Sequence, residues 1–287
     1  MLTVVIGISS ALVFGSADFL GGLASKRMSP IFVTAIAALV GLVVLALALP
    51  FIGGRWSSEA VLLGAASGIS GAIAIGLLYA CLAIGPMSIL SPLTAVVSAI
   101  VPLSVGLAGG ERLGLIGYIA LGLALVAIVL VGFVPEKGAV RPSLKGVLMA
   151  IGSGIAIGAF LIIIDATPDD SGLVPLVMNR AVNATIMFTL VGVLAFIAWR
   201  RAKPFQPVGW QAGLRFAIAC GVIDAVANTG LLLGVRLGEL SVMAVLTALY
   251  PAGTIILAAM VLKERIAVLQ YAGLVLAVAA GAMLALA

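Results

Sequence analysis

Histidine is absent from the 287 residues of this chain, and cysteine occurs only twice, at Cys81 and Cys220. The lack of histidine removes the commonest metal ligand and the usual proton carrier near neutral pH. Both cysteines lie inside apolar runs, where a thiol packs as a small apolar group, so they favour neither a disulfide nor a zinc site. We therefore expect no metal centre, and the sequence implies no cofactor and no catalytic residue.

Charged residues are also scarce, since Asp, Glu, Lys and Arg together make up 9% of the chain, against about 25% in soluble domains. Apolar residues make up 64%. The segment between Glu59 and Glu111 carries no charge at all, although about 20 apolar residues already span a bilayer once. This composition excludes an ordinary soluble enzyme. It predicts an all-α, multi-pass protein of the cell (inner) membrane, surrounded by lipid.

Apolar runs separated by short clusters of Gly, Pro and charged residues define the candidate membrane spans. Each run is long enough to cross a hydrocarbon core about 30 Å thick as a helix that rises about 1.5 Å per residue. The long uncharged segment must turn at Gly85 and Pro86, because a single helix of that length would far exceed the bilayer. The ten expected spans are residues 2–24, 31–52, 60–84, 87–108, 113–134, 144–164, 173–199, 210–235, 240–262 and 266–287.

The two halves of the chain repeat each other at a spacing of 153 residues, which is the separation of Glu111 and Glu264. This shift aligns Glu111-Arg112 with Glu264-Arg265 and Tyr118 with Tyr271. Each half holds five spans, so the second copy enters the membrane from the opposite side, as in the inverted repeats of many secondary transporters. We expect a first repeat over residues 1–134, a linker over 135–143 and a second repeat over 144–287.

Three features of the sequence resemble the EamA repeats of the drug/metabolite transporter superfamily. They are a glycine-rich first span with Phe14-Gly15-Ser16-Ala17-Asp18, small-residue helix pairs 3/4 and 8/9, and the turns Gly110-Glu111-Arg112-Leu113 and Lys263-Glu264-Arg265-Ile266. The resemblance covers essentially the whole chain. It implies ten helices, a central cavity lined by helices 1–4 and 6–9, helices 5 and 10 packed outside, and transport of small metabolites, commonly amino acids, or of drugs.

Two charged residues of the second repeat, Arg180 and Asp224, predict a polar centre inside the membrane. Ionisable side chains in hydrocarbon cost at least about 2.5–3.5 kcal/mol, so each needs a partner or a water-filled cavity. Counted from face A, the side on which the first span begins, the two lie at depths that an arginine side chain can bridge. Asn183 lies one turn from Arg180, and Asn228 one turn from Asp224. One interpretation is a structural lock of mutually neutralised charges. The other is a site for a substrate that carries opposite charges.

Asp18 has no basic residue at a similar depth, because Lys26 and Arg27 lie more than two turns away at the membrane interface. Desolvation disfavours the charged form of a lone carboxylate, which can then be neutral near pH 7. This property suits a proton-coupling group. The alternative is an aspartate that reaches the nearby interface or binds serine hydroxyls.

Prolines in the fourth and ninth spans, Pro92, Pro102 and Pro251, each remove a helix hydrogen bond and allow a kink. Hydroxyl-bearing residues beside them predict polar groups that face a cavity, with ordinary kinked packing as the alternative. Those assigned to the candidate substrate site are Thr94, Ser98, Thr247 and Tyr250. In the third span, Gly64 and Gly68 favour close helix contact over ligand binding.

Together these features predict a secondary transporter that moves a small zwitterionic or amino-acid-like solute by alternating access, coupled to protons. The expected partners are the solute, protons and lipid, with no nucleic acid and a monomer or homodimer as the assembly. Efflux of lipophilic cations is the alternative, although only 6% of the residues are aromatic. A remote alternative is an intramembrane aspartyl protease, but Asp18 and Asp224 lie in neither a Tyr-Asp nor a Gly-x-Gly-Asp context.

The basic residues of the loops predict an orientation. Face A carries only Arg55, Arg112 and Arg236. The opposite side, face B, carries Lys26, Arg27, Lys137, Arg141, Lys145, Arg200, Arg201, Lys203, Lys263 and Arg265. Because short loops rich in Lys and Arg stay in the cytoplasm, face B is expected to be cytoplasmic and both termini extracytoplasmic. The family resemblance implies the reverse, since better-known ten-helix relatives usually keep both termini in the cytoplasm.

Overall fold

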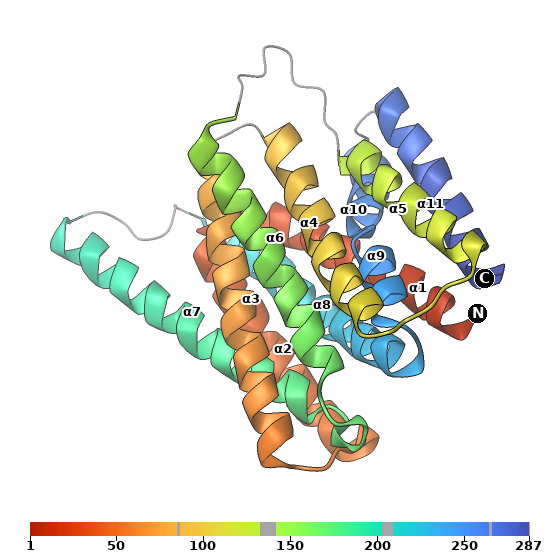
Figure 1. The fold of residues 1–287 in the computed structure, drawn as a ribbon. Helices are drawn as coiled ribbons and strands as arrows, with labels where there is room; N and C mark the ends of the chain where they lie inside the picture. The colour runs from red at the N-terminus through yellow and green to blue at the C-terminus, as the bar shows by residue number, and fades with distance from the viewer. Residues whose placement is uncertain (85–86, 133–141, 203–208, 264–265, 287) are drawn as a thin grey trace.

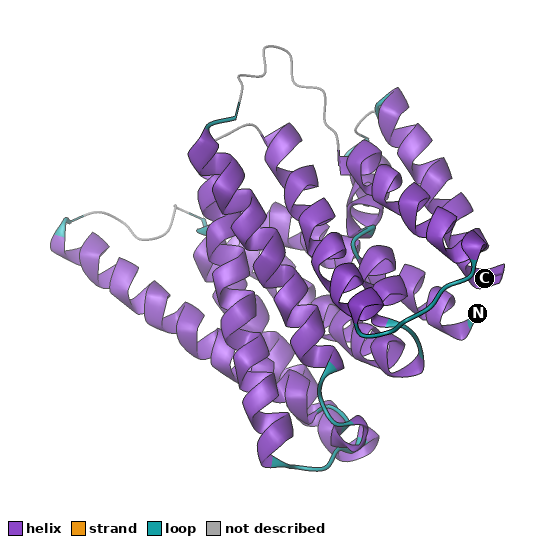
Figure 2. Cartoon of the chain, in the orientation of Figure 1, coloured by secondary structure: helices purple, strands orange, loops and turns teal. Residues whose placement is uncertain are grey.

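The computed structural model describes residues 1–84, 87–132, 142–202, 209–263 and 266–286. Figure 2 shows helices joined by short connections, and no strand occurs within these ranges. The elements are α1 (Leu2–Ser25), α2 (Pro30–Ile52), α3 (Ser58–Ile84), α4 (Met87–Ala108), α5 (Leu115–Gly132), α6 (Leu144–Asp165), the 3₁₀ turn η1 (Asp169–Ser171), α7 (Val174–Arg200), α8 (Gln211–Leu237), α9 (Leu240–Thr247), α10 (Tyr250–Val261) and α11 (Val268–Leu286). The expected turn at Gly85–Pro86, the pair Glu264–Arg265 and most of the linker lie outside the described residues.

The predicted all-α fold with ten spans is confirmed. Within the described ranges, nine segments are long and apolar enough to cross a membrane, and a further apolar helix, Pro92–Ala108 in α4, is shorter. α9 and α10 together supply one of the nine, Leu240–Val261. Hydrocarbon offers no hydrogen-bond partner to the backbone, so apolar runs of this length must satisfy their N–H and C=O groups as helices.

Eight spans form a closed ring, and every two neighbours in this ring come from different halves of the chain. Following the packing contacts, α2 lies on α8, α8 on α1, α1 on α9 and α10, and α9 on α4. The ring continues from α4 to α6, from α6 to α3, from α3 to α7 and back to α2. Such a ring leaves space at its centre rather than a packed core.

The ring obeys the symmetry expected of an inverted repeat. The contact between α1 and α8 has its counterpart in the contact between α6 and α3, and α2 with α8 corresponds to α7 with α3. α4 with α6 likewise corresponds to α9 and α10 with α1. The remaining pair, α5 and α11, pack against each other beside the ring (Figure 1). This agrees with two outer helices, one from each half.

The ninth span is interrupted, as its proline suggests. α9 ends at Thr247 and α10 begins at Tyr250, with Pro251 in its first turn. Proline cannot donate a backbone hydrogen bond and clashes with the preceding turn, so a new helix starts at this point. In contrast, α4 is a single helix although it contains Pro92 and Pro102.

Small residues on α3 allow the backbone of α7 to approach closely. A Cβ atom added at Gly64 would lie 2.6 Å from the carbonyl oxygen of Pro175, and one at Gly68 would lie 2.6 Å from that of Asn179. These distances are shorter than any tolerated contact, so only glycine fits. The prediction of close helix contact at Gly64 and Gly68 is therefore confirmed.

The connections divide between the two faces of the bundle. Face A carries the α2–α3, α4–α5, α6–α7 and α8–α9 connections, and the α2–α3 and α6–α7 connections lie at the bottom of Figure 1. Face B lies at the opposite ends of the helices. The first residues of α1 and the last residues of α11 both lie at face A, close together in Figure 1.

Candidate functional site

A cavity of about 720 Å³ lies inside the ring. Its walls come from six spans and from the end of α5. The lining residues are Ala17, Asp18, Gly21, Gly22 and Ser25 of α1, Pro30, Val33, Thr34, Ala37 and Ala38 of α2, Ile75 and Leu78 of α3, Val131 and Gly132 of α5, Arg180 and Asn183 of α7, Cys220 and Asp224 of α8, and Tyr250, Pro251, Thr254 and Ile255 of α10. The lining reaches the face-B ends of α1 and α2 but not the face-A ends of any helix, so the cavity opens toward face B.

Three charged side chains meet on the cavity wall. Arg180 of α7 and Asp224 of α8 form an ion pair through Nη2 and Oδ2, with 13% and 23% of their side chains exposed. Asp18 of α1 is exposed to the cavity and close enough to Asp224 for the two carboxylates to repel each other. Among the described residues, Asp18 has no ion-pair partner. The cavity thus carries one neutralised pair and one separate carboxylate.

Three polar atoms at this wall have no hydrogen-bond partner in the described part of the chain, and one of them, Oδ2 of Asp224, takes part in the ion pair with Arg180. The other two are Nε of Arg180, a donor, and Oδ1 of Asn183, an acceptor. Asn183 is only 4% exposed and lies one turn from Arg180 on the same face of α7. A buried polar atom without a partner costs free energy, so a ligand or water that satisfies either atom would be stabilised here.

Asn228 lies next to Asp224 on α8, outside the cavity lining. Its amide donates to the backbone carbonyl of Asp224 over 2.8 Å. Asn228 therefore contacts the residue that carries the carboxylate, whereas Asn183 faces the cavity itself.

Three of the predicted binding residues lie in helix packing contacts and not on the cavity wall. The hydroxyl of Thr94 donates to the carbonyls of Leu90 and Ala150, and that of Ser98 donates to the carbonyl of Ala95. Thr247 is buried in α9, where its hydroxyl has no partner among the described residues. Proximity to a proline does not determine which face of a helix a hydroxyl occupies. Tyr250, in contrast, lines the cavity at the start of α10.

The model of the EamA-like transporter family matches residues 1–133 and 144–286, which cover both halves of the chain. The chain belongs to this family. A solved structure, described only as the crystal structure of a protein, has a TM-score of 0.77 with this EamA-like transporter at 17% identity, over 99% of this chain and 96% of that chain. At this identity the likeness concerns the fold alone. No curated protein matches the chain by sequence.

The cavity of this EamA-like transporter contains residues that sequence reasoning did not assign to a site. Cys220 lines the cavity, although its apolar surroundings suggested simple packing. It lies one turn before Asp224 on the same face of α8, and that spacing was a usable signal. Similarly, Gly22 and Ser25 continue the face of α1 that carries Asp18. The wall contributed by α2 offered no such signal, because its lining is mostly Ala, Val and Pro.

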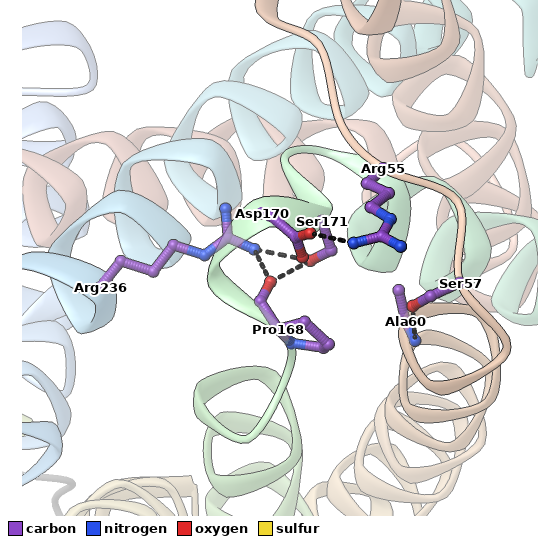
Figure 3. Close-up of polar contacts among 7 residues, drawn as sticks. All are labelled: Arg55, Ser57, Ala60, Pro168, Asp170, Ser171 and Arg236. Carbon is purple, nitrogen blue, oxygen red and sulfur yellow. Dashed lines mark hydrogen bonds and ion pairs between the residues drawn. The ribbon is translucent and has the colours of Figure 1, made fainter.

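Polar contacts join the connections of the transporter at face A (Figure 3). Arg55, which follows α2, forms an ion pair with Asp170 of η1 at 3.2 Å. Arg236, near the end of α8, donates to the carbonyl of Pro168 over 3.2 Å and to the hydroxyl of Ser171 over 2.8 Å. These contacts tie α8 and the α2–α3 connection to the turn between α6 and α7.

Proposed function

We propose that this EamA-like transporter moves a small zwitterionic, amino-acid-like solute across the inner membrane, and that protons drive it. The observation that carries the proposal is the presence of a separate carboxylate, Asp18, and a guanidinium, Arg180, on the wall of one cavity. A zwitterion carries the two complementary charges. A cation alone would match Asp18 but would make no use of the Nε donor of Arg180, which has no partner among the described residues although the guanidinium is paired with Asp224.

The unsatisfied atoms support the same class of solute. The free Nε of Arg180 can donate to a carboxylate, and the free Oδ1 of Asn183 can accept from an ammonium group. Asp18 offers a second acceptor for the ammonium. The remaining wall includes Ile75, Leu78 and Ile255, which suit an apolar side chain. Alternating access would follow from an exchange of roles between the two repeats, residues 1–134 and 144–287.

Efflux of lipophilic cations is the second candidate. The observation in its favour is that two carboxylates, Asp18 and Asp224, face one guanidinium, with the ring of Tyr250 on the same wall. An aromatic face and an acid together attract a cation. This candidate differs from the first because a cation cannot accept a hydrogen bond from the free Nε of Arg180.

A counterflow assay in liposomes distinguishes the two candidates. We expect a panel of amino acids and related zwitterions to include a solute that accelerates exchange of its own labelled form, with no effect of lipophilic cations. Glu59→Gln, at an exposed acid on face A, serves as the control variant that should behave like the wild type. Exchange of lipophilic cations with none of any zwitterion would support the second candidate and reject the first.

We also propose that face B is cytoplasmic and that both termini are extracytoplasmic. The support is the excess of basic residues on face B, of which Lys137, Arg141, Lys203 and Arg265 lie outside the described residues. Lys and Arg in short loops disfavour translocation. In intact cells, single cysteines at Ser143 and Ala202, in a background that carries Cys81→Ala and Cys220→Ala, should resist an impermeant thiol reagent. A cysteine at Trp56, an exposed residue on face A, should react readily. The opposite labelling pattern at all three positions would show that face A is cytoplasmic and that the proposed orientation is wrong.

A further inference from the structure

Glu111 joins the first half of the chain to the second at face A. It follows α4, and its carboxylate lies at the N-terminus of α9. One oxygen accepts from the backbone N–H of Leu240 over 2.8 Å, and the other accepts from that of Ser241 over 3.1 Å. The hydroxyl of Ser241 donates in turn to the carbonyl of Leu103 in α4 over 3.2 Å. A carboxylate from the first half therefore caps a helix of the second half.

This cap is supplied from outside the helix it serves. The residue in the N-cap position of α9 is Glu239, whose own side chain makes no capping hydrogen bond. The free N–H groups at a helix N-terminus and the helix dipole both favour a negative charge at that place. Glu111 is half-buried, and a Cβ added to Gly106 of α4 would collide with its carboxyl group. The carboxylate is thus held in one position.

Glu111 differs in this respect from the ion pair at the same face. The side chains of Arg55 and Asp170 are 77% and 57% exposed, and exposed pairs of this kind contribute little to stability. The carboxylate of Glu111 makes two charge-assisted hydrogen bonds in a less accessible place, and such bonds are stronger than neutral ones. Glu111 is therefore the stronger connection between the halves at face A.

The capped helix leads directly to the cavity wall. All eight residues of α9 are buried, so the helix is held on every side as well as at its start. The helix is then interrupted at Ala248 and Leu249, and α10 begins at Tyr250, which lines the cavity. When the N-terminus of α9 moves, this interruption allows the start of α10, with Tyr250 and Pro251, to move with it.

We propose that Glu111 is a latch that keeps face A closed while the cavity is open to face B, and that it releases the N-terminus of α9 when the cavity opens to face A. The inference rests on alternating access, and goes beyond the proposed solute. The closed contacts of Glu111 belong to the conformation whose cavity reaches face B. Opening face A separates α4 from α9, and the hydrogen bonds to Leu240 and Ser241 cannot survive that separation.

The thiol of Cys220 reports the change, because it lines the cavity. Right-side-out and inside-out vesicles are treated with an impermeant methanethiosulfonate, and Cys220→Ala shows the background. The wild type should react mainly in the vesicles that expose face B. Glu111→Ala removes both acceptors and should raise the rate of reaction from face A about tenfold or more, the loss expected for hydrogen bonds to a charged group. Glu111→Gln keeps one acceptor oxygen and should give a smaller increase.

Two control variants separate the latch from a general effect of charge. Burial and the neighbouring carboxylate of Glu111 raise the pKa of Glu239 above its usual value, and Glu239→Gln mimics the neutral form that this shift favours. It keeps a neutral side chain beside Glu111 and should change the pattern less than Glu111→Ala does, whereas Glu59→Gln at an exposed site should leave the pattern of the wild type unchanged.

Wild-type labelling of Cys220 in both variants of Glu111 would overturn the latch, and so would an equal effect of Glu59→Gln. If Glu111→Ala does not assemble, Glu111→Gln decides alone. The assay uses no solute, so its outcome is independent of whether the transported compound is a zwitterion.

Discussion

Arg180→Ala and Asp224→Asn are both expected to assemble normally in the membrane and to lose transport. The two side chains form an ion pair on the wall of a cavity that opens to face B, and parts of both remain exposed. A fully buried pair that loses one member leaves an uncompensated charge, at a cost of about 3–5 kcal/mol. Here the remaining charge can be hydrated through the cavity, so the cost should be smaller. Loss of a hydrogen bond to a charged substrate group should weaken binding about 10- to 100-fold.

The conservative change Arg180→Lys separates a binding role from a structural lock. Lysine retains the positive charge opposite Asp224 but lacks the Nε donor, which has no partner within the described chain. A lock would be restored by lysine, whereas a binding site for a carboxylate would stay impaired. The measurements are yield and thermal stability in detergent, followed by counterflow in liposomes.

Arg215→Ala provides the matched control for Arg180. The Arg215 guanidinium lies over the ring of Phe216, and the residue does not line the cavity. Its replacement should leave counterflow intact. Normal transport by well-assembled Arg180→Ala and Asp224→Asn would reject both the binding and the lock interpretation. Loss of assembly in both variants, with recovery in Arg180→Lys, would favour the lock.

The sequence predicted the spans and the broken helix because local chemistry determines them. A run of apolar residues must be helical in hydrocarbon, and Pro251 cannot continue the helix that precedes it. The depth of Arg180 and Asp224 could also be counted along each helix from a common face. Two charged residues can form an ion pair only if they lie at similar depths in the membrane. The observed ion pair between Arg180 and Asp224 agrees with the depths counted along their helices.

The direction in which each helix faces could not be predicted in the same way. Hydroxyls of Ser and Thr can donate to a carbonyl three or four residues earlier, so they need no cavity and no partner helix. Thr94 and Ser98 behave in this manner. The placement of Asp18 beside Asp224 depends on the packing of α1 on α8, which joins segments about two hundred residues apart and leaves no local mark. Glu111 carried the family resemblance, but its contact with α9 also required the folded chain.

Asp18→Asn is expected to abolish accumulation driven by a pH gradient while leaving exchange at equal solute concentrations largely intact. Asp18 is exposed to the cavity, has no ion-pair partner among the described residues, and lies close to the carboxylate of Asp224. Either a proton on Asp18 or the ammonium group of a solute relieves the repulsion between these carboxylates. A carrier can then return with Asp18 protonated and cross in the other direction with solute bound.

The coupling follows from linkage between the two ligands. If the solute binds one protonation state of Asp18 more tightly, protons must shift the affinity for solute by the same free energy with which solute shifts the affinity for protons. Asparagine resembles the protonated acid in shape but can neither release nor bind a proton. The variant should therefore equilibrate the solute without concentrating it. Its exchange rate should also lose the dependence on pH that the wild type shows.

Liposomes loaded at one pH and diluted into another measure the accumulation directly, and counterflow at equal pH measures the exchange. Glu59→Gln removes an acid that is exposed at face A and should accumulate solute like the wild type. Asp18→Glu should retain part of the coupling, because it keeps a titratable group in the cavity. If Asp18→Asn still accumulates solute along the pH gradient, Asp18 is not the coupling group and Asp224, the remaining carboxylate in the described cavity lining, becomes the candidate.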